Sequence, residues 1–164
     1  MDDTMREVLA AFERERAAFL ELIETLTAAD WERPTPDNET WTVKDVLGHL
    51  ASTDRSMGSL VKGVVDGTYT VEAGKQFSLD DYNARQVARG REMPVDDLRR
   101  QLVDNRAAFL DLVRQIPDGA WTNDVWSPGF SGAPGEAQPL RDRLLDYAAH
   151  DSEHAVHIRA AIGR

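Results

Sequence analysis

Four long stretches of the sequence repeat apolar side chains every three to four residues, and this periodicity constrains the fold most. The spacing places apolar residues along one face of an α-helix. The first stretch runs from about Thr4 to Leu26, and the second follows Thr42. The third opens at Pro94 and the fourth at Pro139, each expected as a first helical residue. With no two-residue alternation typical of a strand, the pattern predicts an all-α four-helix bundle.

Side chains that cap helices support this interpretation. Thr42 and Asp45 form a T-x-x-D capping box at the start of the second long helix. Ser78 and Asp81 repeat the pattern and predict a shorter helix to about Arg91. One extra short helix is therefore expected between the second and third long helices.

Two loops stand out by their length, residues 67–78 and 117–138. Long loops in compact domains are often functional. The second loop carries Trp121, Trp126 and Phe130. These aromatic residues either line a binding pocket or close one end of the bundle.

Composition limits the kinds of partner and the compartment. A chain of 164 residues fits a single domain, residues 1–164. Its net charge of −10 opposes binding to nucleic acid or to an anionic membrane. It has no cysteine, no signal-like N-terminus and no apolar run long enough to span a membrane, so we expect a cytoplasmic protein. The excess of arginine over lysine suggests a GC-rich bacterial genome.

Three of the four histidines lie in residues 150–159, HDSEHAVHIR. His150 and His154 are four positions apart on a predicted helix, so their rings can converge on one point. On a helical wheel His154 lies about 50° and His150 about 90° from the centre of the apolar face. His49 lies about 100° from the centre of the second helix's face. Three imidazoles are a frequent ligand set for a catalytic zinc ion, and the alternative is a solvated polar edge.

Two acidic residues, Asp54 and Asp151, fall near the middle of apolar stripes. A buried carboxylate requires a partner. Metal-binding histidines commonly donate their second N–H group to a carboxylate. One hypothesis is therefore that these carboxylates orient the histidines. Alternatively, they form buried ion pairs with Arg55, Arg106 or Arg159, or the apolar stripe opens to solvent at their level.

The segment HDSEH also matches H-x-x-E-H, a metallopeptidase pattern in which the glutamate is the general base. Glu153 points away from the apolar face on the wheel, so we assign it no such role. No catalytic residue is assigned beyond the metal centre. His157 is predicted to lie further round the helix, toward solvent.

Three segments resemble, in the same order, the DinB-like superfamily. WTVKDVLGHLASTDRSM resembles its second-helix signature, FSLDDYNARQVARGREMP its following segment, and HDSEHAVHI its C-terminal H-x3-H helix. The resemblance implies a four-helix bundle in which three side chains hold one divalent metal ion. Matched position by position, these are His49, His150 and His154. In the related maleylpyruvate isomerase branch a glutamate can replace the first residue of the C-terminal pair, so His150 indicates the all-histidine form.

The resemblance also implies a cofactor and a class of reaction. Characterised relatives include S-transferases and isomerases that use mycothiol or bacillithiol, and a metal ion with an open position can bind a thiol and lower its pKa. We therefore expect one divalent ion (zinc, nickel or iron), a small-molecule substrate, and mycothiol or bacillithiol as cosubstrate. Residues 67–78 and 117–138 would shape the mouth of the pocket, and a homodimer is expected. Two alternatives remain open: a metal-dependent hydrolase, and a non-enzymatic module that sequesters a small molecule or toxin.

Overall fold

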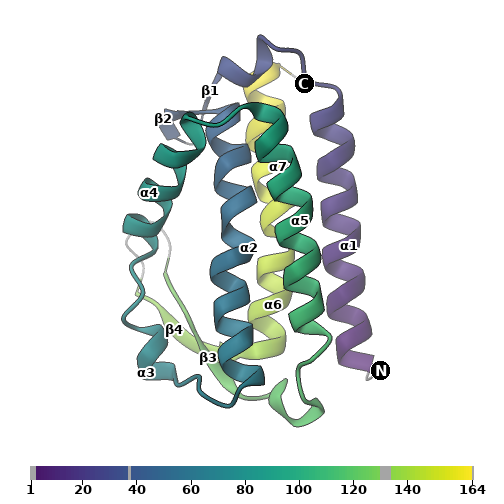
Figure 1. The fold of residues 1–164 in the computed structure, drawn as a ribbon, viewed down its shortest axis with the longest axis vertical. Helices are drawn as coiled ribbons and strands as arrows, with labels where there is room; N and C mark the ends of the chain where they lie inside the picture. The colour runs from purple at the N-terminus through teal and green to yellow at the C-terminus, as the bar shows by residue number, and fades with distance from the viewer. Residues whose placement is uncertain (1–2, 37, 130–133, 164) are drawn as a thin grey trace.

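Four long helical segments form a bundle in the computed structural model, which describes residues 3–36, 38–129 and 134–163. They are α1 (Asp3–Glu24), α2 (Val43–Val65), α5 (Val95–Val113), and a fourth in which α6 (Leu140–Ala148) and α7 (His150–Ile162) follow one another (Figure 1). α1 packs against α6 and α7, and α2 packs against α5. The predicted all-α four-helix bundle is confirmed. In the described part of the chain, no helix is long and apolar enough to cross a membrane.

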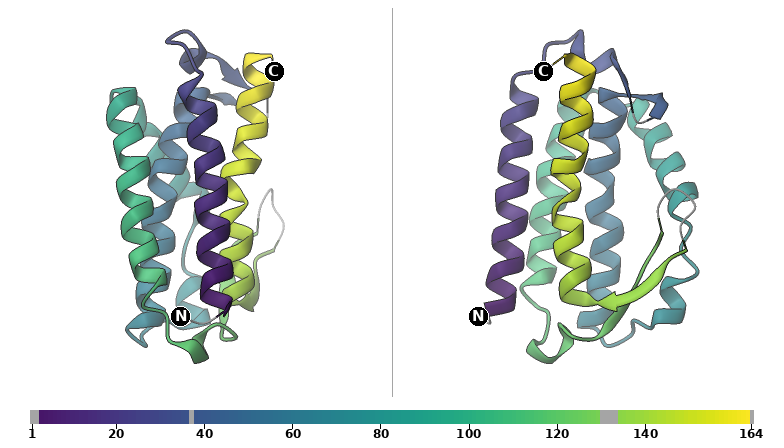
Figure 2. Two further views of the ribbon diagram at one scale, coloured as in Figure 1. Left: turned by 90° about the vertical axis from the view of Figure 1, so that its right-hand side faces the viewer. Right: turned by 180° about the vertical axis from the view of Figure 1, so that it is seen from behind.

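The direction of the helices explains the extra helix. α1 and α6–α7 run one way along the bundle, whereas α2 and α5 run the other way (Figures 1 and 2). Because α2 and α5 are parallel neighbours, the chain must return along the bundle between them. The predicted helix, α4 (Leu79–Arg91), makes this return and packs against α2. A one-turn helix, α3 (Val71–Gly74), precedes it and was not predicted.

The capping residues act largely as predicted. The Thr42 side chain accepts a hydrogen bond from the Asp45 backbone N–H at 3.3 Å, and the Asp45 carboxylate accepts one from the Thr42 N–H at 3.0 Å. Ser78 accepts a bond from the Asp81 N–H at 3.4 Å, so it caps α4. Arg91 donates two bonds of 3.0 Å to the Asp45 carboxylate, which ties the end of α4 to the start of α2.

Two predicted helix starts are wrong by one residue, and one predicted helix is interrupted. Pro94 and Pro139 are cap residues with extended backbones (ψ of 147° and 142°), so each helix begins one position later. The fourth helix is also not continuous, because Ala149 separates α6 from α7. Its two parts still lie end to end (Figure 2).

Two short antiparallel hairpins, which were not predicted, lie between the long helices. Their strands of two to five residues are too short to show a two-residue period. Each hairpin follows a single 3-10 turn. The elements are η1 (Asp30–Glu32), β1 (Pro34–Thr35) and β2 (Asn38–Thr42), then η2 (Asp118–Ala120), β3 (Asp124–Ser127) and β4 (Glu136–Pro139).

Four buried charged residues, one from each long segment of the bundle, form a layer across its middle. We call Arg16 (α1), Asp54 (α2), Arg106 (α5) and Asp151 (α7) the charged layer. It separates two apolar clusters, one around Phe12 and Phe109, the other around Phe19, Leu50 and Leu102. Two arginines facing two aspartates leave the layer with no net charge.

Candidate metal centre

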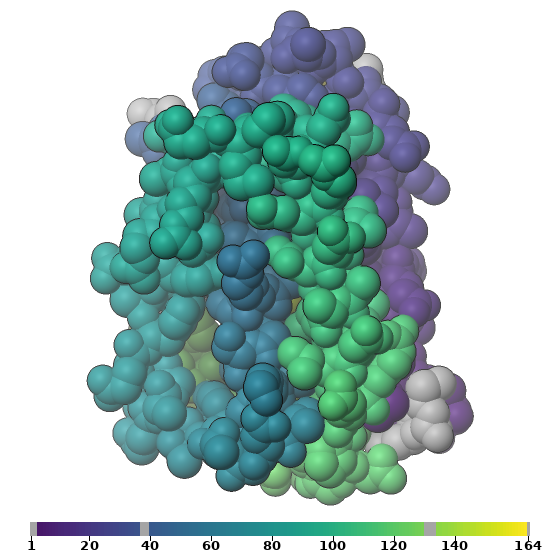
Figure 3. All heavy atoms as spheres, viewed as in Figure 1, coloured from purple at the N-terminus to yellow at the C-terminus, as the bar shows by residue number. Residues whose placement is uncertain are grey.

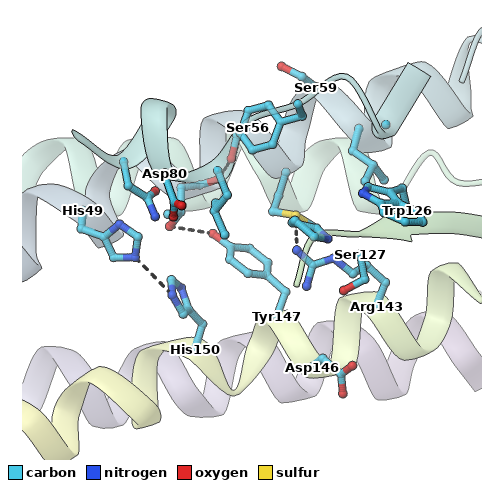
Figure 4. Close-up of a pocket in the computed structure, with 18 of the residues that line it drawn as sticks. His49, Ser56, Ser59, Asp80, Trp126, Ser127, Arg143, Asp146, Tyr147 and His150 are labelled. Atoms are coloured by element: carbon cyan, nitrogen blue, oxygen red, sulfur yellow. Dashed lines mark hydrogen bonds between the residues drawn. The ribbon is translucent and has the colours of Figure 1, made fainter. Parts of the chain in front are cut away.

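Three histidine rings converge at the interface of α2 and α7. His49 lies on α2, and His150 and His154 lie one turn apart on α7. The Nε2 atom of His150 is 3.2 Å from that of His49 and 3.1 Å from that of His154. The ring centroids of His49 and His154 are 4.9 Å apart. The structure thus brings together the three residues that the sequence singled out as metal ligands. Figure 4 shows two of them, His49 and His150, with their rings pointing toward one another.

The local environment favours neutral imidazoles, which is the form that binds metal. His49 is buried and His150 is half-buried. Burial lowers the pKa of His49 well below its usual range, and the neighbouring His150 and His154 rings lower it further. Burial also lowers the pKa of His150 well below its usual range, and the His154 ring and the Arg143 charge add to this effect.

The arrangement of the Nε2 atoms fits a metal ion better than a hydrogen-bond network. A neutral imidazole Nε2 carries either one hydrogen or one lone pair, so it can form one good hydrogen bond. His150 Nε2 has two imidazole nitrogens at hydrogen-bond distance, and these contacts cannot both be hydrogen bonds. A tetrahedral ion bound at about 2.0–2.1 Å would hold its nitrogen ligands about 3.3 Å apart, close to the distances here. The potential ligand atoms of all three residues lie within 4.8 Å of one another.

The two aspartates, Asp54 and Asp151, form ion pairs with buried arginines. Arg16 donates from Nε to Asp151 at 2.7 Å and from Nη2 to Asp54 at 3.3 Å. Arg106 donates from Nε to both Asp54 oxygens, at 3.1 and 3.0 Å. The Nδ1 atoms of His49 and His150 are buried without a hydrogen-bond partner among the described residues. The ion-pair hypothesis therefore describes Asp54 and Asp151, and they do not hydrogen-bond to these histidines.

Sequence reasoning found one of the arginine partners and missed the other. Arg106 was among the candidates, whereas Arg55 and Arg159 are exposed. Arg16 was not considered, although it lies between Phe12 and Phe19 on the apolar face of α1. A charged residue in the middle of an apolar stripe was the available signal.

Aromatic side chains enclose the histidines. The Trp41 ring, from β2, lies 5.1 Å from the His49 ring, and the Tyr147 ring lies 5.6 Å from the His150 ring. Tyr147 is buried, and burial raises the pKa of its hydroxyl well above its usual range. Its hydroxyl donates to Asp54 at 2.7 Å, which connects the histidine site to the charged layer.

The histidines lie at one end of a cavity of about 910 Å³ between α2, α4, β3 and α6–α7. Figure 3 shows the hollow in the surface between α2 and α4. Residues of both predicted pocket loops line it, including Tyr69, Gly74 and Trp126. The two interpretations of the aromatic residues each hold in part: Trp126 lines the cavity, whereas Trp121 is buried in the core. Phe130 lies outside the described residues.

The strand at residues Asp124–Ser127 explains this division of roles. Consecutive residues in a strand face opposite sides. Val125 therefore enters the core while Trp126 faces the cavity. The Trp126 backbone N–H donates to the Tyr69 hydroxyl at 2.9 Å, which fixes the hairpin against the segment after α2.

Two further residues of the C-terminal segment differ in part from expectation. Glu153 is exposed, as the wheel suggested, yet it also borders the cavity. His157 is half-buried rather than turned to solvent, and its ring lies 5.7 Å from the ring of His154. His157 does not belong to the converging group of three.

Comparison with solved structures identifies the same fold in other proteins. Two crystal structures of mycothiol-dependent maleylpyruvate isomerase each match 96% of the chain. The first has a TM-score of 0.77 at 18% identity, and the second, in which a histidine is replaced by alanine, has a TM-score of 0.76 at 17% identity. The chain spans 63% of the length of those proteins. YfiT from Bacillus subtilis is described as a probable metal-dependent hydrolase with an unusual four-helix bundle topology. Its structure matches 99% of this chain over 90% of its own length, with a TM-score of 0.69 at 17% identity. At these identities the likeness establishes the fold.

Comparison of sequences establishes the family. No curated protein sequence matches the chain. The family described as the mycothiol maleylpyruvate isomerase N-terminal domain matches residues 12–153, which include all three converging histidines. The chain therefore belongs to this family, within the DinB-like superfamily.

Proposed function

We propose that the protein is a metal-dependent enzyme that acts on a small molecule in the cavity and uses a low-molecular-weight thiol as cosubstrate. His49, His150 and His154 would hold one divalent ion, and zinc, nickel and iron all suit imidazole ligands. The observation that carries the proposal is the convergence of three Nε2 atoms, 3.1 and 3.2 Å apart in the two closest pairs, at the end of a cavity. When bound, the ion would supply Lewis acidity that lowers the pKa of a thiol or of water.

The protein's own residues would position the ion and exclude solvent around it. His49 and His150 are kept neutral by burial, so their lone pairs are available. The rings of Trp41 and Tyr147 lie against those of His49 and His150, and all four side chains line the cavity. Three protein ligands would leave a coordination position facing the cavity for a thiol or a substrate.

The family supports a thiol cosubstrate. Its description and two of the solved relatives refer to mycothiol. The chain has no cysteine, so any thiol nucleophile must arrive with a cosubstrate. We accordingly propose thiol transfer or thiol-dependent isomerisation, with mycothiol or bacillithiol as the natural thiol.

A metal-dependent hydrolase is the second candidate, and the description of YfiT favours it. The same three histidines and the same cavity would serve, with water in place of the thiol. The third hypothesis, a module that only sequesters a ligand, would have been favoured by histidines too far apart to share an ion. The short Nε2 distances argue against it.

Metal content is the first test. Untagged protein is analysed by elemental mass spectrometry beside His154→Ala and the control His157→Ala. His157 is a histidine of the same helix that lies outside the converging group. We expect about one ion per chain in wild type and in His157→Ala, and none in His154→Ala. Equal metal in wild type and His154→Ala, or no metal after reconstitution, would refute the proposed centre.

Turnover then separates the reactions. Metal-loaded protein is assayed on small electrophiles and on esters, each with and without a low-molecular-weight thiol. Consumption that requires the thiol supports the transferase or isomerase. Ester cleavage without thiol supports the hydrolase. Tight ligand binding with no turnover in either assay supports the sequestering module.

The proposed partners are small molecules. The net charge of −10 disfavours nucleic acid and anionic membranes. We also propose a homodimer, which light scattering of the purified protein will test.

A further inference from the structure

A buried arginine in the cavity forms no ion pair with the carboxylates of the described residues. Arg143 lies on α6, lines the cavity and is 8% exposed. Its Nη2 contacts Met57 Sδ at 3.7 Å, and sulfur is a weak acceptor. Its Nε is buried without a hydrogen-bond partner among the described residues, and none of their carboxylates forms an ion pair with it. Burial lowers the pKa of Arg143 more than the nearby Tyr147 and the exposed Asp146 carboxylate raise it, but a guanidinium stays protonated at neutral pH.

Other buried arginines of the bundle are neutralised. Arg16 and Arg106 each contact both aspartates of the charged layer. The carboxylate of Asp146, one turn after Arg143, is exposed and accepts a hydrogen bond from the Gln138 side chain at 3.0 Å. An unpaired buried charge destabilises a fold. Unpaired buried charges are typical of ligand sites, where the protein tolerates a lower folding stability because the charged group binds the ligand.

The position of Arg143 relates it to the histidines. Arg143, Tyr147 and His150 are spaced by four and three residues, so they share one face of α6–α7. Seven residues correspond to about 10 Å along the helix axis. In Figure 4 Arg143 lies beyond Tyr147 from His150. A ligand group bound to Arg143 would therefore lie on the same cavity wall as the histidines, about two helical turns away.

We propose that Arg143 is the anion-recognition residue of the cavity and that it binds a carboxylate of the small-molecule ligand. The planar guanidinium can donate two parallel hydrogen bonds to a carboxylate. A dianionic phosphate would keep an uncompensated charge, because the acidic residues Asp80 and Asp146 border the same cavity. Those acids are exposed and screened by water and salt, whereas Arg143 is desolvated. The proposal extends the proposed function, since it defines the chemical class of ligand in the same cavity.

Apolar side chains around Arg143 indicate the rest of the ligand. Met57, Leu60 and Trp126 line the same cavity, and Met57 contacts the guanidinium. A carboxylate on an apolar body would pair with the guanidinium and cover these side chains. The probes 4-phenylbutyrate and its uncharged amide, 4-phenylbutanamide, have this shape and differ only in charge.

The test measures binding of both probes by calorimetry to the full chain, treated with a chelator so that no metal contributes. We expect the acid to bind at least about tenfold more tightly than the amide, as hydrogen bonds between charged groups allow. Arg143→Met should abolish this preference, and Arg143→Lys should retain part of it. His49→Ala should leave the preference intact.

Several results would overturn the proposal. Equal binding of acid and amide to wild type would do so, as would a preference that survives in Arg143→Met. Loss of the preference in His49→Ala would place the carboxylate at the histidines instead. The thermal midpoint of each ligand-free variant is measured as well: removal of an unpaired charge should raise it in Arg143→Met, and a lower midpoint would contradict the premise. A protein that shows the acid preference but binds no metal would refute the metal centre alone.

Discussion

The Tyr147 hydroxyl donates a 2.7 Å hydrogen bond to the Asp54 carboxylate, while the Tyr147 ring lies 5.6 Å from the ring of His150. One side chain thus connects the charged layer in the core to the candidate metal centre. The layer sets where α7 lies relative to α2, because Asp151 belongs to α7 and Asp54 to α2. His150 is the chain neighbour of Asp151, so the position of that helix also places the histidines.

Substitution Tyr147→Phe should separate the two roles of this residue. It removes the hydrogen bond to the charged Asp54 and the 2.9 Å contact of the same hydroxyl with Thr53 Oγ1, and we expect the free energy of unfolding to fall by about 1.5–3 kcal/mol. The ring that covers His150 is retained, so metal per chain should not change. Urea unfolding and elemental analysis check both expectations. Loss of metal in a folded Tyr147→Phe variant would mean that the hydroxyl itself supports the site.

The charged layer should respond differently to single and paired substitutions. Arg16→Met leaves Asp151 and Asp54 with one arginine between them, and we expect a loss of about 3–5 kcal/mol of stability. The double variant Arg16→Met/Asp151→Leu keeps the neutral Arg106–Asp54 pair and should be more stable than Arg16→Met. Urea midpoints measure both.

An exposed ion pair provides the control for that experiment. Arg141 pairs with Glu7 at 2.9 Å between α6 and α1, at the surface. Arg141→Met should leave the urea midpoint unchanged within error. The interpretation of the layer as one coupled unit makes a further demand. The double variant Arg16→Met/Asp151→Leu should lose less stability than Arg16→Met and Asp151→Leu lose when their separate effects are added, and an equal loss would contradict it.

Metal binding should stabilise the fold through the histidine group alone. A free ion at about 1,000 times its Kd adds about 4 kcal/mol to the free energy of unfolding. We therefore expect added zinc or nickel to raise the thermal midpoint of wild type and of His157→Ala, and a chelator to reverse the effect. His154→Ala should show no response. An equal response in His154→Ala would place the bound ion elsewhere.

The wall of the cavity between α3 and β3 should depend on a glycine. A Cβ atom at Gly74 would lie 2.7 Å from Trp126 Cβ and would also collide with the Tyr69 hydroxyl. We expect Gly74→Ala to displace Trp126, change the tryptophan fluorescence, and cost about 1–3 kcal/mol of stability. Gly119→Ala is the control, since a Cβ there would have no atom of the described residues within 4 Å. Unchanged fluorescence and stability in Gly74→Ala would show that the wall adjusts freely.

The sequence by itself determined the features that depend on neighbours within about one helical turn. The four apolar stripes and the Thr42–Asp45 capping box are of this kind. So is the spacing of His150 and His154, because an α-helix brings residues i and i+4 together regardless of the rest of the fold. The stripes also showed that Asp54 and Asp151 would be buried and would need partners.

Only the tertiary structure decided which distant residues meet. Arg16 is 135 positions from Asp151. His49 is 101 positions from His150. Helical periodicity gives the face on which each residue lies, but not which helix covers that face or at what height. The environment of Arg143 also depends on the tertiary structure. Several elements together enclose the cavity that this side chain lines, and no local pattern in the sequence shows where such a cavity forms.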